Sequence, residues 1–332
     1  MRVLVTGGAG FIGSNYVHSV LREHPGDAVL VFDKLTYAGN PENLADVADD
    51  SRYRFVPADI CDEAAVTEAM AQVDAVVNFA AETHVDRSIQ SAGAFIDTDV
   101  KGLYLLLEAA RARGIERFLH VSTDEVYGSI ETGSFTEDDP FRPSSPYSAS
   151  KAGGELMAQA YARTFGYRIL VTRGSNTYGP YQYPEKVVPL FVTNLLDDQP
   201  VPLYGDGLNV RDWLYVTDHC AGIDTVLRTG VPGQAYNLGG DQERTNLELT
   251  HTLLRLLGKG PALIKHVTDR PGHDRRYSIT NEKARALGWE PIVSFEEGLA
   301  LTVAWYRDNE SWWRRIKDGS YKEYYRQMYE GR

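Results

Sequence analysis

Short apolar runs alternate with amphipathic stretches through the first half of the chain. The apolar runs contain almost no polar positions, which is typical of strands that are buried on both faces. Strands that alternate with helices predict a parallel sheet with helices packed on both of its faces. The predicted strands cover residues 3–5, 28–32, 53–56, 75–79, 118–121 and 168–171, and the predicted helices cover residues 11–22, 64–70, 92–113 and 146–165.

The pattern becomes irregular after Thr172, where Gly, Pro and Tyr are dense. This change predicts a sheet domain over residues 1–173 and a smaller, mixed α/β domain over residues 174–332. Residues 208–230 contain a strand-then-helix pattern and are expected to return to the first domain. Two tryptophans, Trp312 and Trp313, precede an aromatic segment at residues 321–329. We expect a terminal helix docked on the body there, rather than a surface for a ligand or partner.

The amino-acid composition argues against several classes of binding partner. The 332 residues include 46 acidic and 34 basic side chains, a net charge of −12, and no basic block, so a nucleic-acid partner is not expected. The two cysteines, Cys61 and Cys220, form no metal-binding spacing, and we expect no metal site and no disulfide framework. Since a strand pattern begins at once and no long apolar run follows, we expect a cytoplasmic protein without a membrane partner.

A glycine-rich turn links the first predicted strand to the first predicted helix. Gly7, Gly10 and Gly13 leave room for a pyrophosphate to approach the backbone at the helix N-terminus. Asp33 follows Gly13 by 20 residues and ends the second predicted strand, where a carboxylate binds ribose hydroxyls and repels a 2′-phosphate. The pattern therefore predicts a Rossmann-type, doubly wound sheet that binds NAD rather than NADP. Asp59 and Ile60, after the third strand, either meet the adenine or begin a helix.

Tyr147 and Lys151 are spaced four residues apart, so they share one face of a helix that Pro146 begins. An ammonium group and a nicotinamide cation both favour phenolate, so a lowered Tyr147 pKa is expected. Tyr147 is thus a candidate base for a sugar hydroxyl.

A polar triplet, Thr123, Asp124 and Glu125, ends the fifth predicted strand. The Thr123 hydroxyl can bond the oxygen that Tyr147 deprotonates. Adjacent strand residues point to opposite faces, so both carboxylates reach one ligand only if the strand is already turning. An acid and a base side by side suit elimination of water, whereas the alternative is a solvated acidic turn.

These motifs together resemble the extended short-chain dehydrogenase/reductases, and within them the dTDP-glucose 4,6-dehydratases. The Thr-Asp-Glu triplet is the feature that separates the dehydratases from the related epimerases. The resemblance runs from residue 1 to about residue 315. It is carried by residues 7–13, 80–88, 122–128, 147–151, 176–180, 184–186, 202–207 and 269–274.

The resemblance implies a redox-neutral cycle on dTDP-glucose. Tyr147 removes the proton of the 4-hydroxyl while C4 gives its hydride to NAD⁺. Glu125 then takes the C5 proton, Asp124 protonates the departing 6-hydroxyl, and NADH returns the hydride to C6. The product is a 4-keto-6-deoxy sugar, and Lys151 and Thr123 assist.

The resemblance also assigns binding residues. It implies NAD contacts at Gly7, Gly10, Phe11, Ile12, Gly13, Asp33, Asp59, Ile60, Ala80, Tyr147 and Lys151. It implies nucleotide-sugar contacts at His84, Asn176, Lys186, Pro202, Tyr204, Arg211, Asn246, Arg270, His273 and Tyr277. A local pocket of Arg and Lys suits a diphosphate even on an acidic protein.

One position departs from the family. Asp99 stands where Asn is commoner, and an ionised carboxylate donates no hydrogen bond, so we assign it no catalytic role.

The alternative functions are a UDP-glucose 4,6-dehydratase, a nucleotide-sugar 4-epimerase and a non-catalytic NAD-binding protein. A homodimer is expected, because residues 102–113 and 147–165 carry more apolar side chains than one sheet-facing stripe requires, and because the resemblance implies that these two helices pair with the same helices of a second copy. These include Leu103, Leu105, Leu106, Leu107, Met157 and Tyr161.

Overall fold

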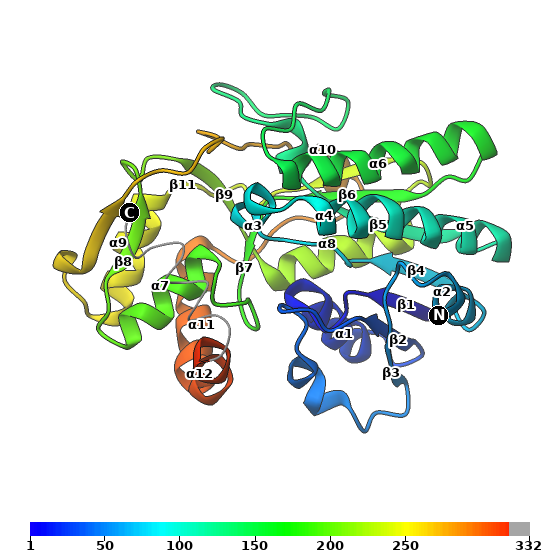
Figure 1. Ribbon diagram of the computed structural model, residues 1–332, viewed down its shortest axis with the longest axis horizontal. Helices are drawn as coiled ribbons and strands as arrows, with labels where there is room; N and C mark the ends of the chain where they lie inside the picture. Colours follow the sequence, from blue (N-terminus) through cyan, green and yellow to red (C-terminus); the bar gives the residue numbers. More distant parts are fainter. Residues whose placement is uncertain (319–332) are drawn as a thin grey trace.

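The computed structural model describes residues 1–318, and the aromatic segment predicted at residues 321–329 lies outside the described residues. A parallel sheet of seven strands forms the larger part of the protein, in the order β10-β6-β5-β4-β1-β2-β3 (Figure 1). Six of its strands match the predicted ones, although β6 starts two residues later than expected. The strands are β1 (Arg2–Thr6), β2 (Ala28–Asp33), β3 (Tyr53–Pro57), β4 (Ala75–Asn78), β5 (Arg117–Thr123), β6 (Leu170–Gly174) and β10 (Ala235–Leu238).

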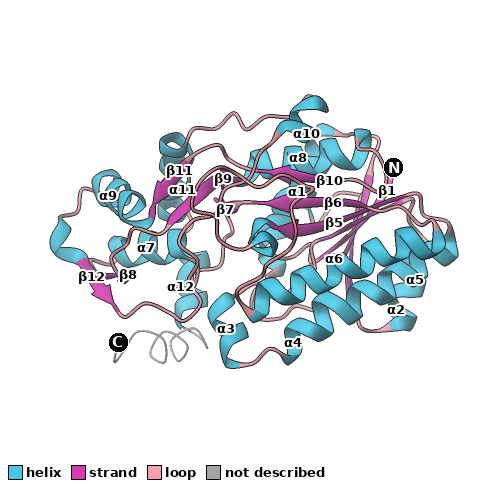
Figure 2. Cartoon of the chain, turned by 90° about the horizontal axis from the view of Figure 1, so that it is seen from above, coloured by secondary structure: helices cyan, strands magenta, loops and turns pink. Residues whose placement is uncertain are grey.

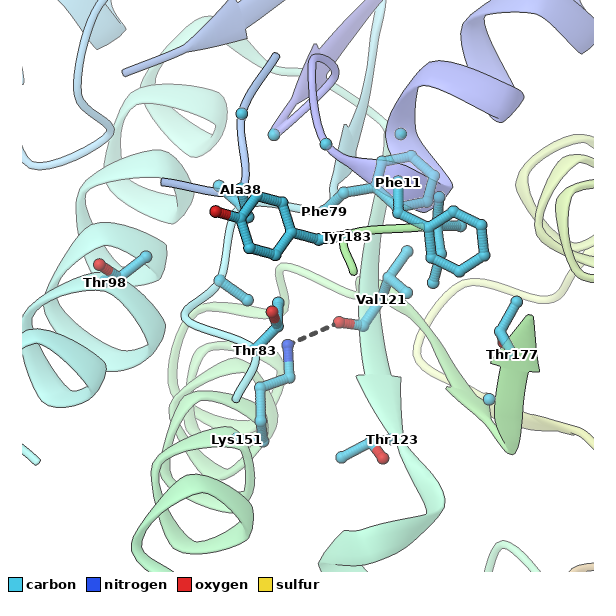
Figure 3. Close-up of a pocket in the computed structure, with 18 of the residues that line it drawn as sticks. Phe11, Ala38, Phe79, Thr83, Thr98, Val121, Thr123, Lys151, Thr177 and Tyr183 are labelled. Atoms are coloured by element: carbon cyan, nitrogen blue, oxygen red, sulfur yellow. Dashed lines mark hydrogen bonds between the residues drawn. The ribbon is translucent and has the colours of Figure 1, made fainter. Parts of the chain in front are cut away.

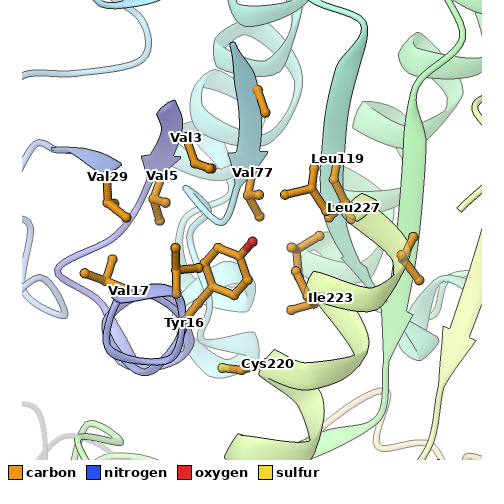
Figure 4. Packing of buried hydrophobic residues seen from close by; sticks show 14 of the residues in the cluster. Val3, Val5, Tyr16, Val17, Val29, Val77, Leu119, Cys220, Ile223 and Leu227 are labelled. Atoms are coloured by element: carbon orange, nitrogen blue, oxygen red, sulfur yellow. The ribbon is translucent and has the colours of Figure 1, made fainter. Parts of the chain in front are cut away.

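Helices cover both faces of this sheet, as the continuously apolar strands predict. On one face, Tyr16 of α1 and Ile223 of α8 pack against Val5 and Val77 of the sheet (Figure 4). On the other face, α5 and α6 run side by side over the remaining apolar side chains of the strands (Figure 2). The helices that cover the sheet are α1 (Phe11–Glu23), α8 (Val216–Thr229), α2 (Glu63–Met70), α5 (Leu103–Arg113) and α6 (Pro146–Phe165).

The predicted helix over residues 92–113 is present as one continuous run from Gly93 to Arg113, and it contains a π-helical turn. A short α4 (Gly93–Ile96) leads into a π-helical turn, η2 (Asp97–Gly102), before α5 begins. A Cβ on Gly102 would lie 2.4 Å from a methyl group of Ile60, so this turn packs tightly against the loop that follows β3. Wide turns of this kind often occur at functional sites, and η2 places Asp99 in the interior.

The smaller part of the protein is a mixed α/β unit around its own apolar cluster, at the left of Figure 1. It has one sheet of order β11-β9-β7 and a second pair, β12-β8. Its strands are β7 (Asn176–Tyr178), β8 (Val201–Tyr204), β9 (Val210–Tyr215), β11 (Glu243–Thr245) and β12 (Ile264–Val267). Its helices are α7 (Val187–Leu196), α9 (Asn246–Leu257), α11 (Phe295–Asp308) and α12 (Glu310–Asp318).

The chain crosses between the two parts more than once. Helix α8 packs on α1 of the large sheet, whereas the strand just before it, β9, pairs with β7 and β11 of the smaller part. Strand β10 was not foreseen, and it pairs with β6 at the edge of the large sheet. The short helices α3 (Val85–Gln90) and α10 (Glu282–Ala286) and the 3-10 turns η1 (Pro41–Val47), η3 (Asp124–Tyr127) and η4 (Pro261–Leu263) complete the described elements.

Helices α5 and α6 carry both buried and exposed apolar side chains. Leu103, Leu106, Leu107 and Tyr161 are buried in the apolar cluster that these two helices form with the sheet and with each other. Other apolar side chains on these helices are exposed instead, namely Tyr104, Leu156 and Phe165. None of the helices within residues 1–318 has the length and hydropathy that a membrane crossing requires.

Candidate active site

The glycine-rich turn between β1 and α1 is built so closely that side chains are excluded. A Cβ on Gly13 would lie 2.3 Å from the carbonyl oxygen of Gly7. Gly7 itself has a φ of 66°, and a Cβ there would lie 2.7 Å from the backbone nitrogen of Ala80. Helix α1 starts after Gly10 with no side chain capping its N-terminus. The helix end therefore remains able to bind an anion through its backbone N–H groups.

Asp33 holds this turn from the end of β2. Its carboxylate accepts hydrogen bonds from the backbone N–H groups of Ala9 at 3.0 Å and Leu35 at 2.8 Å. Burial raises the pKa of Asp33, and these two donors act in the opposite direction. A carboxylate has four lone-pair sites, so two of them remain for ribose hydroxyls.

Asp59 lies on the same cavity, beside Ile60. Its carboxylate accepts from the backbone N–H of Cys61 at 2.9 Å and lies 3.6 Å from the ammonium group of Lys34. The alternative in which Asp59 begins a helix is wrong, because Asp62 caps α2 instead. All residues predicted to contact NAD line this one cavity.

Helix α6 carries the predicted Tyr147–Lys151 pair into the cavity. It begins as expected, with Pro146 in its first turn and a reciprocal capping box between Ser145 and Ser148. The Lys151 ammonium group donates to the carbonyl oxygen of Val121 at 2.8 Å, which ties α6 to the end of β5 (Figure 3). Burial lowers the pKa of Lys151, while Asp99 and Glu155 raise it.

The expected lowering of the Tyr147 pKa is not found. Burial raises this pKa well above its ordinary value, and the carboxylates of Glu125 and Asp99 raise it further. The Thr123 hydroxyl acts in the opposite direction. The sequence argument counted the positive charges near the phenol, whereas the fold also places acidic side chains around it.

The polar triplet lies where β5 ends. The strand stops at Thr123 and the 3-10 turn η3 begins at Asp124, so both carboxylates line the same cavity. The Thr123 hydroxyl accepts from the backbone N–H of Glu125 at 3.3 Å and donates to Asp124 Oδ1 at 3.3 Å. The turn predicted from the sequence is therefore present at this point of the chain.

The two acids have different electrostatic surroundings. Burial raises the pKa of Asp124 well above its ordinary value, and the neighbouring carboxylates of Glu125 and Asp212 raise it further. Burial also raises the pKa of Glu125, but Arg270, Arg211 and Lys186 all lower it. Burial thus raises the pKa of both acids, but three cations oppose this rise at Glu125, and surroundings that differ in this way suit one acid and one base.

Two of the predicted substrate contacts, Asn176 and Lys186, line the cavity with the predicted catalytic residues. Lys186 donates to the carbonyl oxygen of Thr83. Arg211 and Arg270 are close enough to Glu125 for their charges to act on its pKa. Arg270 also faces Asp86 of α3, with 3.5 Å between their charged atoms.

The remaining predicted contacts do not line this cavity. Arg211 lies over the ring of Tyr277, 4.3 Å from its centre, and donates to the carbonyl oxygen of Asp274 at 2.9 Å. The rings of Tyr204 and His273 meet edge to face at 6.0 Å. Arg211, Tyr277, Tyr204 and His273 thus form a second group of contacts beside the cavity, in the smaller part of the protein. The predicted contacts outside the cavity lining are His84, Pro202, Tyr204, Arg211, Asn246, Arg270, His273 and Tyr277.

Several residues at the site escaped the sequence analysis. His219 of α8 lines the cavity, hydrogen-bonds the Thr177 hydroxyl at 2.8 Å and has a pKa lowered to about 4 by burial. Asp212 acts on Asp124 from β9. No local pattern marks either residue, because both reach the site through the crossing of the chain between its two parts.

This chain is similar to known proteins over most of its length. A sequence profile described as GDP-mannose 4,6 dehydratase matches residues 4–302. A dTDP-glucose 4,6-dehydratase from Streptomyces niveus is 54% identical over 322 residues, which cover 96% of each chain. One from Neisseria meningitidis is 49% identical and covers 97% of each chain. The chain belongs to the dTDP-glucose 4,6-dehydratase family.

Solved structures distinguish this family from the epimerases. The dTDP-glucose 4,6-dehydratase DesIV from Streptomyces venezuelae, crystallised with NAD, has a TM-score of 0.93 and 54% identity, covering 96% of this chain and all of its own. A UDP-glucose 4-epimerase from Thermus thermophilus, in complex with NAD, has a TM-score of 0.86 and 34% identity, covering 93% of this chain and all of its own. The two classes share the fold, and the dehydratase is the more similar in sequence.

Proposed function

We propose that this chain converts dTDP-glucose to dTDP-4-keto-6-deoxyglucose with a tightly bound NAD. The observation that carries the proposal is the pair Asp124 and Glu125 at the end of β5, in one cavity with Tyr147. A 4-epimerase needs the tyrosine and the cofactor but has no elimination step that would use an adjacent acid and base. The names of the relatives support the same substrate.

The residues around the glycine-rich turn fit the cofactor. The N-terminus of α1, where Gly10 supplies no side-chain cap, suits a pyrophosphate, and Asp33 retains lone pairs for the adenosine ribose. Tyr147 and Lys151 line the same cavity as the glycine-rich turn and the end of β5, so they would help to hold the cofactor there. When bound, NAD supplies a hydride acceptor for C4 and afterwards a hydride donor for C6.

Tyr147 and Thr123 handle the first proton. Tyr147 accepts the proton of the 4-hydroxyl, and the Thr123 hydroxyl holds the same oxygen. The Lys151 ammonium group, fixed by the Val121 carbonyl, stabilises the phenolate form that accepts the proton. Because burial and the nearby carboxylates of Glu125 and Asp99 raise the Tyr147 pKa, its function as a base depends on positive charge near the phenol.

Glu125 and Asp124 handle the elimination. Glu125 takes the C5 proton, which the neighbouring 4-ketone has acidified, and returns a proton to C5 when the hydride is added at C6. The charges of Arg270, Arg211 and Lys186 oppose the rise in the Glu125 pKa that burial causes, which favours its function as a base. Asp124 gives its proton to the departing 6-hydroxyl, which leaves as water. Burial and the neighbouring carboxylates of Glu125 and Asp212 raise its pKa, which favours the protonated form that this step needs. The sugar stays in one orientation because both carbons must face the same nicotinamide.

The second group of contacts accounts for the nucleotide. Arg211 and Arg270 offer planar guanidinium groups that match the two phosphates. Tyr204, Tyr277 and Pro202 supply flat apolar surfaces for a pyrimidine. Burial and the charges of Arg270 and Arg211 lower the pKa of His273 to about 4, so it contributes a neutral ring.

Incubation with dTDP-glucose and, in parallel, UDP-glucose tests the proposal. We expect a 4-keto-6-deoxy product from dTDP-glucose without added NAD, and a much slower reaction with UDP-glucose. Mass spectrometry measures the loss of 18 mass units as water, which no epimerase produces. A product of unchanged mass with an inverted C4 would contradict the proposal, and equal rates with both nucleotides would contradict the choice of dTDP.

We further propose that the protein is a cytoplasmic homodimer joined through α5 and α6. Tyr104, Leu156 and Phe165 leave 41%, 53% and 52% of their surfaces exposed on these helices. A two-fold interface would cover them with the same face of a second copy. Both cysteines are free, which suits a reducing compartment. Sedimentation should give a dimer that Leu156→Glu converts to a monomer, and an active wild-type monomer would refute the assembly.

A further inference from the structure

The helix α12, drawn in red in Figure 1, is hydrogen-bonded to the glycine-rich turn through one intermediate residue. The indole N–H of Trp312 donates to Asn43 Oδ1 at 2.9 Å. The side-chain amide of Asn43 in turn donates to the carbonyl oxygen of Ala9 at 3.0 Å. Both side chains are buried, so neither hydrogen bond competes with bulk water. Because an indole only donates and a carbonyl only accepts, the two partners fix the orientation of the Asn43 amide.

Ala9 is the point at which this chain of contacts meets the predicted cofactor site. It lies between Gly7 and Gly13, it is fully buried, and its backbone is held on both sides. Asp33 binds its N–H at 3.0 Å, while its carbonyl oxygen accepts from Asn43 and from the backbone N–H of Asn40 at 3.0 Å. A shift of Asn43 would therefore move the turn and the Asp33 carboxylate together.

The ring of Trp312 is anchored in the smaller part of the protein. It contacts the rings of Trp305 and Tyr181, with ring centres 5.1 Å and 6.2 Å apart. Tyr181 has a φ of 66°, which is uncommon for a residue with a bulky side chain, and Gln182 after it lines the cavity. The same aromatic group thus contacts a loop on the substrate side and, through Asn43, the turn on the NAD side.

We propose that Trp312 is a positioning residue that holds the glycine-rich turn in its NAD-binding conformation and slows the release of NAD. It acts through Asn43 and does not itself touch the cofactor. The inference rests on the proposed function only in that the enzyme retains NAD between turnovers. An enzyme that regenerates its cofactor in every cycle has no need to release it. A hydrogen bond from a distant helix lowers the mobility of the turn that must open before NAD can leave.

The neighbouring tryptophan supplies a matched control. Trp313 is also fully buried in α12, but its indole N–H donates to the carbonyl oxygen of Tyr306 at 2.8 Å, within the smaller part. Trp312→Phe and Trp313→Phe each remove one buried indole N–H and keep an aromatic ring. Only the first breaks the connection to Asn43 and Ala9.

The experiment measures NAD dissociation from the full-length enzyme by dilution into a trap of excess labelled NAD. Trp312→Phe should raise the dissociation rate by about tenfold, the effect of one buried hydrogen bond, and Trp313→Phe should leave it within about twofold of wild type. Thermal unfolding of both variants, measured in the same preparations, shows whether a general loss of stability explains any difference. Equal dissociation rates in the two variants would overturn the inference.

A double-mutant cycle tests the route through Asn43. Asn43→Ala should raise the dissociation rate by at least as much as Trp312→Phe, and the double variant should release NAD no faster than Asn43→Ala alone. Additive effects would mean that Trp312 acts by another route and would refute the proposed role. Wild-type enzyme that carries no NAD on purification would instead contradict the proposed function, so the two failures are distinguishable. If Trp312→Phe fails to fold, Trp312→Tyr, which also lacks the indole N–H and keeps an aromatic ring, takes its place in both comparisons.

Discussion

Replacing Asp124 with Asn separates the two halves of the proposed reaction. Asp124 is buried, and among residues 1–318 its Oδ2 atom has no hydrogen-bond partner, so an amide of the same shape fits there. Burial and the carboxylates of Glu125 and Asp212 favour a protonated Asp124, so the substitution leaves the local charge nearly unchanged. Tyr147 and Lys151 therefore keep the surroundings that the first proton transfer needs.

The elimination step should then fail selectively. Asn has no proton to give to the departing 6-hydroxyl, and loss of a general acid costs about 10²–10⁴ in rate. That range corresponds to about 3–5 kcal/mol in the barrier for loss of water. Oxidation at C4 should proceed at nearly the wild-type rate, so reduced cofactor and the 4-keto sugar should accumulate on the enzyme.

Single-turnover mixing with dTDP-glucose measures this directly through the absorbance of the reduced nicotinamide. Asp124→Asn should show a persistent rise, whereas Tyr147→Phe should show none, because C4 keeps its hydride while its hydroxyl keeps the proton. Glu125→Gln should permit the rise but block exchange of the C5 proton with deuterated solvent. Wild-type dehydration by Asp124→Asn would refute the reasoning and reduce this residue to an acid of the turn.

Three further predictions follow from buried polar groups. Asp33→Ala should weaken NAD binding by about 1–3 kcal/mol, because Ala9 also loses its partner; calorimetry with cofactor-free protein measures this, and unchanged affinity would contradict it. Burial raises the pKa of Asp99 to about 6, although the hydrogen bond that the Ser150 hydroxyl donates to it at 2.6 Å acts in the opposite direction. The folded chain therefore holds this proton to higher pH than the unfolded chain. The contribution of Asp99 to stability is therefore present below about pH 4 and lost as the pH rises through about 6, an effect of up to about 3 kcal/mol. Asp99→Asn should gain stability relative to wild type over that interval in urea unfolding, and parallel curves would argue against it. Glu155→Ala should lower the free energy of unfolding by about 3–5 kcal/mol, since it leaves the buried Arg173 unpaired, and a loss below about 1 kcal/mol in the same assay would disprove this.

The local sequence determined most of the large sheet and its cofactor turn. Strands such as 28–32 are apolar at every position, which only a sheet buried on both faces accommodates, and β2 forms there. Gly7 and Gly13 stand where a Cβ would collide with the backbone, and the start of α6 is encoded by Ser145 and Pro146. These features depend on near neighbours, so the chain encodes them without reference to the rest of the fold.

Only the tertiary structure decided how charged groups act at the site. The sequence placed Tyr147 beside Lys151 and predicted a lowered pKa, but the fold buries the phenol near Glu125 and Asp99, and its pKa is raised. Likewise, Asp124 and Glu125 are adjacent and alike in sequence, and they differ because Asp212 faces one while Arg270 and Lys186 face the other. Electrostatic energies depend on distance and burial, and those are set by strands and loops far apart along the chain. The bond from Trp312 to Asn43 joins residues 269 positions apart for the same reason.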